Sequence, residues 1–209
     1  GNWTMIPSPV QWQGGGNNLP GWSQGMIPTA DGMGIIQMAS SQITTNGSTN
    51  NNEMLVARAQ MIVPGKTYTV ANQKSGLAVD IPGNTPVHGV GLQQGDFNGG
   101  PAQRWTFNDL GHNVWTVTNS GNGLAWDDAG WGTNAGTPLI QWDYNGLPVQ
   151  QFKLRPVGNG GWKFISVNAN LPVSVTNASL AAGAQLIFWT NSTATEQNWF
   201  VSQPDFVPD

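Results

Sequence analysis

The side chains in this sequence that could take part in a reaction are few, and they do not form a catalytic set. Asp127 and Asp128 are the only adjacent acidic pair. Cleavage of a glycosidic bond needs two carboxyl groups roughly 5–10 Å apart around one substrate, whereas successive side chains of a strand point to opposite faces. His88 and His112 stand alone, without a serine or metal-ligand pattern beside them, and we expect both on surface loops. These residues favour binding chemistry over catalysis.

The composition of the 209-residue chain suits a ligand that offers hydroxyl groups and C–H faces, such as a sugar. Charged residues make up only 9%, far below the usual quarter, and Asn, Gln, Ser, Thr and 28 Gly take their place. Eleven tryptophans add flat apolar rings. A net charge of −4 with seven basic residues argues against nucleic acid and anionic membranes as partners. No apolar run is long enough for a membrane span, and the absence of cysteine excludes disulfides and thiolate ligands.

Three segments of the chain are variants of one sequence. The middle copy is 124–152, LAWDDAGWGTNAGTPLIQWDYNGLPVQQF. An interval of 47 residues separates the equivalent members of four sets: Leu77, Leu124 and Leu171; Gly89, Gly136 and Gly183; Leu92, Leu139 and Leu186; and Gln103, Gln150 and Gln197. Such a period predicts supersecondary units that share one core, because a single copy cannot bury its own apolar face.

Each repeat contains four short runs typical of strands, separated by turns rich in Gly, Pro and Asn. These runs cover 68–71, 77–80, 90–94 and 103–107 in the first repeat, 114–117, 124–127, 139–142 and 150–154 in the second, and 162–167, 171–175, 185–189 and 197–201 in the third. Many short, evenly spaced strands predict a closed all-β unit, which leaves no exposed sheet edge.

Residues 1–64 differ from the rest, since they hold all six methionines and have no later copy. The apolar runs 34–39 and 54–63 predict strands, and the polar stretch 40–52 predicts a hairpin or loop around Asn46-Gly47. A β unit of this size is marginal by itself. We therefore expect a small β-rich unit that packs on the domain at 65–209 or is the remnant of a larger region.

The repeated order of Leu, Asp, Gly, an apolar-aromatic strand and Gln-x-Trp resembles the ricin B-type β-trefoil lectins, which are also counted among carbohydrate-binding modules. The resemblance covers roughly 66–203, with repeats at about 66–111, 112–158 and 159–203. It implies a twelve-stranded β-trefoil with up to three shallow sugar sites, one per repeat. In that family each site uses an Asp after the second strand, an aromatic residue ending the third, a polar residue beyond it, and an Asn-Gln pair.

The second repeat keeps the most complete set of these residues. The resemblance makes Asp127 an acceptor for sugar hydroxyls, Trp142 a flat face for a pyranose, and Asn145 and Gln150 further polar partners. The Asn before the motif glutamine is Val149 here, so one hydrogen bond is missing. The alternative is that Trp142 is core and Asp127 a turn former. Three nearby residues could widen the site or simply pack: Trp126, Asp128 and Trp131.

The other two repeats are less complete, so we rank the sites second, first, third. The first keeps Asp80, Asn98 and Gln103 but has Gly95 at the aromatic position, where Phe97 could substitute. The third has Trp189 and Gln197 but carries Ser174 in place of the Asp, and serine offers no charge-assisted bond. The three motif glutamines could brace the fold or reach a ligand, since an amide both donates and accepts.

The sequence therefore predicts a non-catalytic, secreted or extracellular lectin module that recognises a galactose-type sugar or a plant or cell-surface glycan, with no cofactor and no metal. Two alternatives stay open. One is a protein-binding β-trefoil such as a protease inhibitor, although such a protein would carry one long specialised loop, and the repeats have equal lengths. The other is the binding module of a larger glycoside hydrolase. The sequence leaves the sugar and the oligomeric state undetermined.

Overall fold

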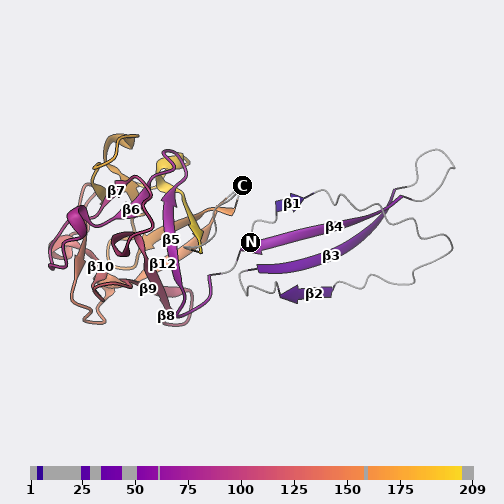
Figure 1. The fold of residues 1–209 in the computed structure, drawn as a ribbon, viewed down its shortest axis with the longest axis horizontal. Helices are drawn as coiled ribbons and strands as arrows, with labels where there is room; N and C mark the ends of the chain where they lie inside the picture. The colour runs from indigo at the N-terminus through magenta and orange to yellow at the C-terminus, as the bar shows by residue number, and fades with distance from the viewer. Residues whose placement is uncertain are drawn as a thin grey trace. The chain divides into compact units, whose positions relative to one another are not determined.

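The chain divides into two compact units, Gly1–Val63 and Pro64–Asp209. The computed structural model describes residues 62–157 and 160–203 in full, together with four strands closer to the N-terminus (Figure 1). These residues form strands and short 3-10 turns, and no α-helix occurs among them. Each unit is described by itself below.

The first unit contains one antiparallel sheet in the order β1-β4-β3-β2. Its strands are β1 Thr4–Ile6, β2 Gly25–Pro28, β3 Gly34–Ile43 and β4 Asn51–Gln60. The β3–β4 hairpin pairs without interruption from Gly34↔Gln60 to Ile43↔Asn51. The predicted strand at 34–39 is therefore too short, because the pairing continues into a polar stretch that hydrophobicity does not mark. The predicted strand at 54–63 starts and ends too late, and the Asn46-Gly47 turn lies outside the described residues.

The second unit contains twelve strands in the described ranges, four in each repeat. They are β5 Thr67–Asn72, β6 Ala78–Asp80, β7 Gln93–Gly95 and β8 Trp105–Asp109; β9 Val114–Asn119, β10 Ala125–Asp128, β11 Leu139–Trp142 and β12 Phe152–Pro156; and β13 Trp162–Ser166, β14 Val173–Val175, β15 Leu186–Phe188 and β16 Trp199–Ser202. Strand β16 pairs with β5, so the last repeat closes onto the first. All twelve predicted strands are present, although several bounds differ.

The motif glutamines are not in strands, which corrects the predicted strand starts at 103, 150 and 197. Each glutamine ends a 3-10 turn that precedes the last strand of its repeat: η2 Pro101–Gln103, η4 Pro148–Gln150 and η7 Thr195–Gln197. Proline opens two of these turns, where a missing N–H costs nothing. The turn delivers the following aromatic residue, Trp105, Phe152 or Trp199, into the core, where all three are fully buried.

Three leucines meet around the pseudo-threefold axis of the second unit. Leu92, Leu139 and Leu186 are fully buried, and the Leu92 N–H donates to the Leu139 carbonyl at 2.9 Å. One amide completes this arrangement, since Gln185 Nε2 lies 2.9 Å from the Leu92 carbonyl, 3.4 Å from that of Leu139 and 3.2 Å from that of Leu186. The equivalent positions are Gly91 and Pro138, so a single side chain fills a place common to three repeats.

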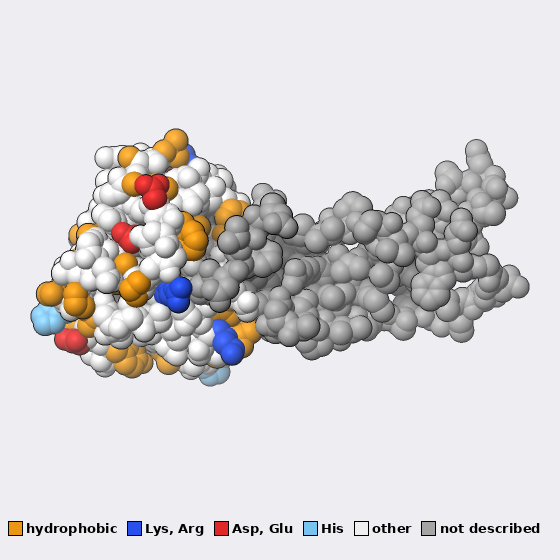
Figure 2. Space-filling model, viewed as in Figure 1, with side chains coloured by type: hydrophobic (Ala, Val, Ile, Leu, Met, Phe, Trp, Pro, Cys, Tyr) orange, Lys and Arg blue, Asp and Glu red, His pale blue; other side chains and the backbone are white. Residues whose placement is uncertain are grey.

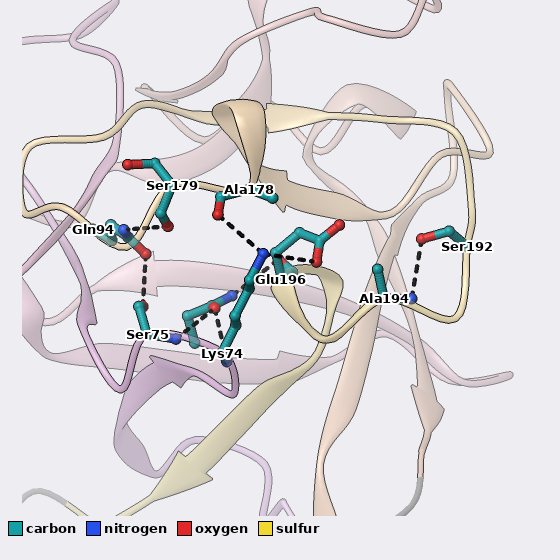
Figure 3. A network of polar contacts seen from close by, with 9 residues as sticks. Lys74, Ser75, Gln94, Ala178, Ser179, Ser192, Ala194 and Glu196 are labelled. Carbon is teal, nitrogen blue, oxygen red and sulfur yellow. Dashed lines mark hydrogen bonds and ion pairs between the residues drawn. The ribbon is translucent and has the colours of Figure 1, made fainter.

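The repeats join through the second-to-third strand hairpins. Gln94, which is fully buried, donates to the carbonyl of Ser179 in the third repeat at 3.0 Å and accepts from Ser75 (Figure 3). It also donates to the Ala181 carbonyl at 2.9 Å. Lys74 reaches the Ala178 carbonyl and Glu196 beside this joint. Gln141 donates in the same way to two backbone carbonyls of the first repeat. Phe188 occupies the equivalent position in the third repeat. Two joints are thus polar and one is apolar.

The described surface of the second unit is predominantly uncharged. Figure 2 shows Lys, Arg, Asp and Glu side chains as isolated spots among neutral side chains on the face it displays. Large apolar side chains are exposed among the described residues, including Phe97, Trp131, Trp142 and Trp189. Exposed aromatic rings beside neutral polar groups are the features expected of a surface that binds sugar.

Candidate functional site

The β10–β11 hairpin places Asp127 and Trp142 on one face. Asp127 pairs with Ile140, and Trp142, the last residue of β11, pairs with Ala125. Side chains two residues apart on a strand share a face, so Asp127 and Trp142 are diagonal neighbours across the hairpin, a separation of roughly 7–8 Å between backbones. Trp142 is 39% exposed, whereas Asp127 is 6% exposed at the base of the same surface.

Gln150 fixes the carboxylate of Asp127. The fully buried Gln150 amide donates through Nε2 to Asp127 Oδ2 at 2.8 Å and to the Asp143 carbonyl at 2.8 Å. Its Oε1 accepts from the Asn145 backbone N–H at 2.7 Å. Both ends of the amide are therefore committed to the fold, and Gln150 braces the loop after β11 while it positions Asp127.

Two polar groups near Trp142 keep capacity for a ligand. Asp127 Oδ1 receives no hydrogen bond from a described residue, and it is open to solvent. Asn145 is exposed, and its Oδ1 accepts from the Leu147 N–H at 2.9 Å while its Nδ2 makes no hydrogen bond within the described residues. The second repeat thus offers an acceptor, a donor and an aromatic face together.

The two adjacent carboxyl groups lie in different surroundings. Burial raises the pKa of Asp127 above its ordinary value, opposed by the hydrogen bond from Gln150. Burial also raises the pKa of Asp128 to about 7, with hydrogen bonds from Ser166 and Asn168 opposing it and the charge of Asp127 adding to it. Asp128 Oδ2 accepts from Ser166 Oγ at 2.6 Å, and Oδ1 is buried without a partner among the described residues. The two side chains therefore do not act on one ligand.

The first repeat keeps the hydrogen bond from the motif glutamine to the aspartate but lacks the aromatic residue. Gln103 Nε2 donates to Asp80 Oδ1 at 3.1 Å and to the Asp96 carbonyl at 2.8 Å. Gln93 donates to Asp80 Oδ2 at 2.9 Å, so both carboxylate oxygens already have partners. Gly95 stands at the aromatic position, and a Cβ there would lie 3.2 Å from Asp80.

Two further residues of the first repeat stay at the surface. Asn98 donates its backbone N–H to Gln103 Oε1 at 2.9 Å, and its Oδ1 accepts from the Gly100 N–H at 2.7 Å. Phe97 is exposed two positions after Gly95. This repeat therefore offers an amide and a displaced ring around an aspartate that already has two donors.

The third repeat keeps the exposed tryptophan but has a lysine in place of the aspartate as the charged partner of its motif glutamine. Trp189 is 47% exposed, whereas Ser174 is buried at the aspartate position. The buried Lys163 replaces the carboxylate as the charged partner of the motif glutamine, because its Nζ donates to Gln197 Oε1 at 3.2 Å, to Asn191 Oδ1 at 2.7 Å and to the Ser192 carbonyl. Burial lowers the pKa of Lys163, and nearby Arg155 adds to this shift.

Two tryptophans near the second site have different roles. Trp126 is fully buried and packs edge-on against Trp105, Phe152 and Phe164 at ring-centroid distances of 5.4, 5.8 and 5.3 Å, so it belongs to the core. Trp131 is 56% exposed and has a left-handed backbone with φ of 60°. Such a conformation is rare for a bulky residue.

His88 is a residue of this site that the sequence did not reveal. Its ring lies 4.6 Å from that of Trp142, and its Nδ1 is 3.2 Å from Asp143 Oδ2. The histidine belongs to the first repeat and the tryptophan to the second. One pattern in the sequence could have indicated this contact. An interval of 53 residues separates Gly89 from Trp142 and also Gly136 from Trp189, and it links positions in neighbouring repeats.

The fold and this arrangement define a β-trefoil with one well-formed surface site in the described part of the chain. The family model described as ricin-type beta-trefoil lectin domain-like matches residues 57–142 and 148–206. The chain belongs to this family, which confirms the predicted resemblance and fold class. A search of curated proteins found no matching relative. Among the described residues, no helix is long and apolar enough to cross a membrane.

Solved structures of several kinds share the fold. The designed threefold-symmetric protein ThreeFoil is 28% identical with a TM-score of 0.65, over 66% of this chain and 98% of its own. A ricin B-like lectin from Macrolepiota procera, solved in complex with lactose, is 19% identical with a TM-score of 0.62, over 69% and 100%. An exo-β-1,3-galactanase from Clostridium thermocellum is 20% identical with a TM-score of 0.65, over 85% of this chain and 44% of the galactanase.

Proposed function

We propose that this chain is a non-catalytic, extracellular carbohydrate-binding module whose principal site is in the second repeat. The observation that carries the proposal is the pairing of a solvent-exposed Trp142 with a carboxylate, Asp127, on one face of a hairpin, with Gln150 holding that carboxylate in place. A pyranose has hydroxyl groups at its rim and an apolar patch on one face, and this pair meets both.

The arrangement of the acidic residues supports binding without catalysis. Asp127 meets the motif glutamine, whereas Asp128 accepts from Ser166 and Asn168. Asp128 therefore does not join Asp127 as the second carboxyl group that hydrolysis of a glycosidic bond requires, and the other carboxylate near Trp142, that of Asp143, is exposed and lies beside His88. Membership of a lectin-domain family supports the same assignment.

The second site has the largest set of groups available to a ligand. In the first repeat, Asp80 already accepts two side-chain hydrogen bonds and no aromatic residue stands at the Gly95 position. In the third repeat, Trp189 has no carboxylate partner from Ser174. One shallow site binds a monosaccharide in the micromolar to millimolar range, so higher avidity requires several repeats on one branched or clustered glycan.

The test is a glycan array followed by titration calorimetry on matched variants. Asp127→Asn removes the charge and keeps an acceptor for Gln150; because hydrogen bonds to charged groups are worth about 1.5–3 kcal/mol, we expect roughly tenfold weaker binding. Trp142→Ala removes the aromatic face and should weaken binding roughly three- to tenfold. Asp80→Asn and Trp189→Ala are the controls in the other repeats and should change affinity less. An array without any bound glycan, or controls that lose more affinity than the two test variants, would show the proposal to be wrong.

A further inference from the structure

The contact between His88 and Trp142 joins two repeats at the edge of the second site. The two rings are tilted by 38° with centroids 4.6 Å apart, and the histidine Nδ1 lies 3.2 Å from Asp143 Oδ2. About half of the His88 side chain and two thirds of the Asp143 side chain are exposed. Because these groups are exposed, the contact is not core packing, and it places His88 beside the indole of the second site.

Gln141 and Gly89 hold the loop that carries His88. The buried Gln141 donates through Nε2 to the carbonyls of Thr85 and Val87 at 2.6 and 2.8 Å, and its own backbone carbonyl accepts from the Gly89 N–H at 2.7 Å. Gly89 has φ of +82°, and a Cβ there would lie 3.2 Å from Trp142 Cζ3. Glycine therefore permits both the turn and the close approach to the indole. Hydrogen bonds therefore fix the backbone immediately before and immediately after His88.

The same joint recurs without the same side chains. Gly136 approaches Trp189 in the equivalent place, where a Cβ would lie 3.7 Å from Cζ3. The residue before this glycine is Ala135, and the residue equivalent to Asp143 is Thr190. The fold thus requires the glycine and the loop at this joint but not the histidine or the aspartate. A feature that the scaffold does not require is a candidate for ligand selection.

Two acidic residues, Asp127 and Asp143, lie near Trp142. Gln150 Nε2 donates to Asp127 Oδ2 and to the backbone carbonyl of Asp143, and the Asp143 carboxylate lies beside His88, whose ring contacts Trp142. Among the described ion pairs, Lys74 meets Glu196, and the partner of Asp143 is His88. A ligand carboxylate beside Trp142 would therefore approach the carboxylates of Asp127 and Asp143, and like charges brought together oppose binding.

We propose that His88 and Asp143 form a specificity-determining rim of the second site, which is therefore built by two repeats and selects uncharged saccharides over carboxylate-bearing ones. The inference rests on the proposed sugar-binding function and names the class of sugar. The imidazole and the Asp143 carboxylate meet hydroxyl groups of a neutral sugar, since both can take part in hydrogen bonds with them. A uronic or sialic acid brings a negative charge to the same place and is excluded.

The test is an array of neutral hexosides printed beside their C6-carboxylate counterparts, such as galactosides beside galacturonides. We expect the wild-type chain to bind the neutral member roughly tenfold more strongly. Asp143→Asn should reduce this preference at least severalfold, because one of the two repelling charges is removed. His88→Ala, which copies Ala135 at the other joint, should weaken binding of the neutral member severalfold. Thr190→Ala, at the exposed position equivalent to Asp143 in the third repeat, is the control and should change neither signal.

Each outcome separates the two proposals. His88 and Asp143 are exposed, so both variants should unfold within a few degrees of the wild-type temperature, and lost binding is then not lost fold. If the wild type binds neutral sugars and both variants keep its affinity and preference, the rim is not a specificity element while the sugar-binding function stands. A wild-type preference for the acidic members overturns the inference as well. An array with no bound member shows that the sugar-binding function itself is wrong.

Discussion

Asp127 and Asp128 are identical neighbours that the fold uses in opposite ways. One faces the open side of the β10–β11 hairpin, where a glutamine holds it and one oxygen stays open to solvent. The other is fully buried, with two donors on Oδ2 and none on Oδ1 among the described residues. A buried carboxylate with an unpaired oxygen opposes ionisation, which is why the pKa of Asp128 rises to about 7.

The stability of the fold should therefore decrease as pH rises from about 4 to about 7. A carboxyl group with a folded-state pKa near 7 and an ordinary unfolded-state value near 3.8 binds more protons in the folded chain, so deprotonation favours unfolding throughout this window. At about 1.4 kcal/mol per pKa unit, we expect a loss of roughly 2–4 kcal/mol from Asp128. The raised pKa of Asp127 acts in the same direction.

Asp128→Asn isolates this effect, because asparagine keeps the shape and cannot ionise. We expect the variant to be more stable than the wild type at pH 8 and to lose most of the slope between pH 4 and 7. Thermal unfolding across this pH range measures both. Asp96→Asn, at an exposed position, is the control and should keep the wild-type slope. Equal slopes in Asp128→Asn and the wild type would contradict the assignment.

Trp131 should be a position where substitution increases stability. Its backbone is left-handed, as are the equivalent Asn84 and Ala178, with φ of 60°, 52° and 51°. Asparagine tolerates this region better than tryptophan or alanine, and a left-handed residue costs of order 1 kcal/mol. Because the Trp131 side chain is 56% exposed, its loss removes little burial. We expect Trp131→Asn, and Ala178→Asn as its matched variant, each to raise the unfolding temperature by a few degrees. A lower unfolding temperature for Trp131→Asn would indicate that the indole packs more than its exposure suggests.

At the scale of elements, the joints between repeats depend on three equivalent side chains. Gln141 binds two carbonyls of a loop in the first repeat and Gln94 binds two carbonyls of a loop in the third, whereas Phe188 stacks on Phe152 at a centroid distance of 6.3 Å. A buried carbonyl without a donor costs about 1–3 kcal/mol. The polar joints are therefore specific for a loop that presents its carbonyls, and the apolar joint needs no such loop.

Gln141→Leu should cost stability and also weaken the second site. The change leaves the Val87 carbonyl without its donor, while the Thr85 carbonyl keeps the Val87 N–H at 2.9 Å, so we expect roughly 1–3 kcal/mol of destabilisation in denaturant unfolding. The loop that carries His88 then loses its anchor, and affinity for a neutral sugar should decrease as well. Gln94→Leu is the control: the equivalent joint should lose similar stability while binding at the second repeat is retained. Equal loss of binding in both variants would show a general effect of instability.

In the second unit the sequence was sufficient for the number of strands, but not for all of their bounds or for the contacts between repeats. The interval of 47 residues placed the core leucines, the aromatic residues after the motif glutamines and all twelve strands, because a hydrophobic pattern repeated three times leaves little freedom. It could not show whether Gln150 braces or binds, since an amide does both. His88 was missed because alignment of the repeats compares equivalent positions, whereas this contact joins positions of two different repeats.

At the scale of the whole second unit, the position of Gln185 departs from threefold symmetry, since Gly91 and Pro138 occupy the equivalent places. Gln185 fills the space that Gly91 leaves open, since a Cβ on Gly91 would lie 2.6 Å from Gln185 Nε2. We expect Gly91→Ala to destabilise the fold by roughly 1–3 kcal/mol, because the amide must leave the leucine carbonyls or the backbone must shift. In the double variant with Gln185→Ala the added methyl group has room, so the two effects should not add. Additive losses in denaturant unfolding would contradict this account of the axis.

The second unit should fold and bind without the first. Pro64–Asp209 forms a compact unit, and its own first residues are fixed within it, since the Gly65 N–H donates to the Phe107 carbonyl at 2.7 Å and the Phe107 N–H to the Lys66 carbonyl at 3.2 Å. All of the site contacts described above, including His88 on Trp142, lie inside this range. We therefore expect a chain that begins at Pro64 to unfold cooperatively and to bind the same glycan as the full chain within about threefold, a difference under about 1 kcal/mol. Circular dichroism and titration calorimetry on both chains test this. A shortened chain that folds but binds nothing would mean that residues 1–63 contribute to the site, and one that fails to fold would mean that the boundary at Pro64 cuts through the folding unit.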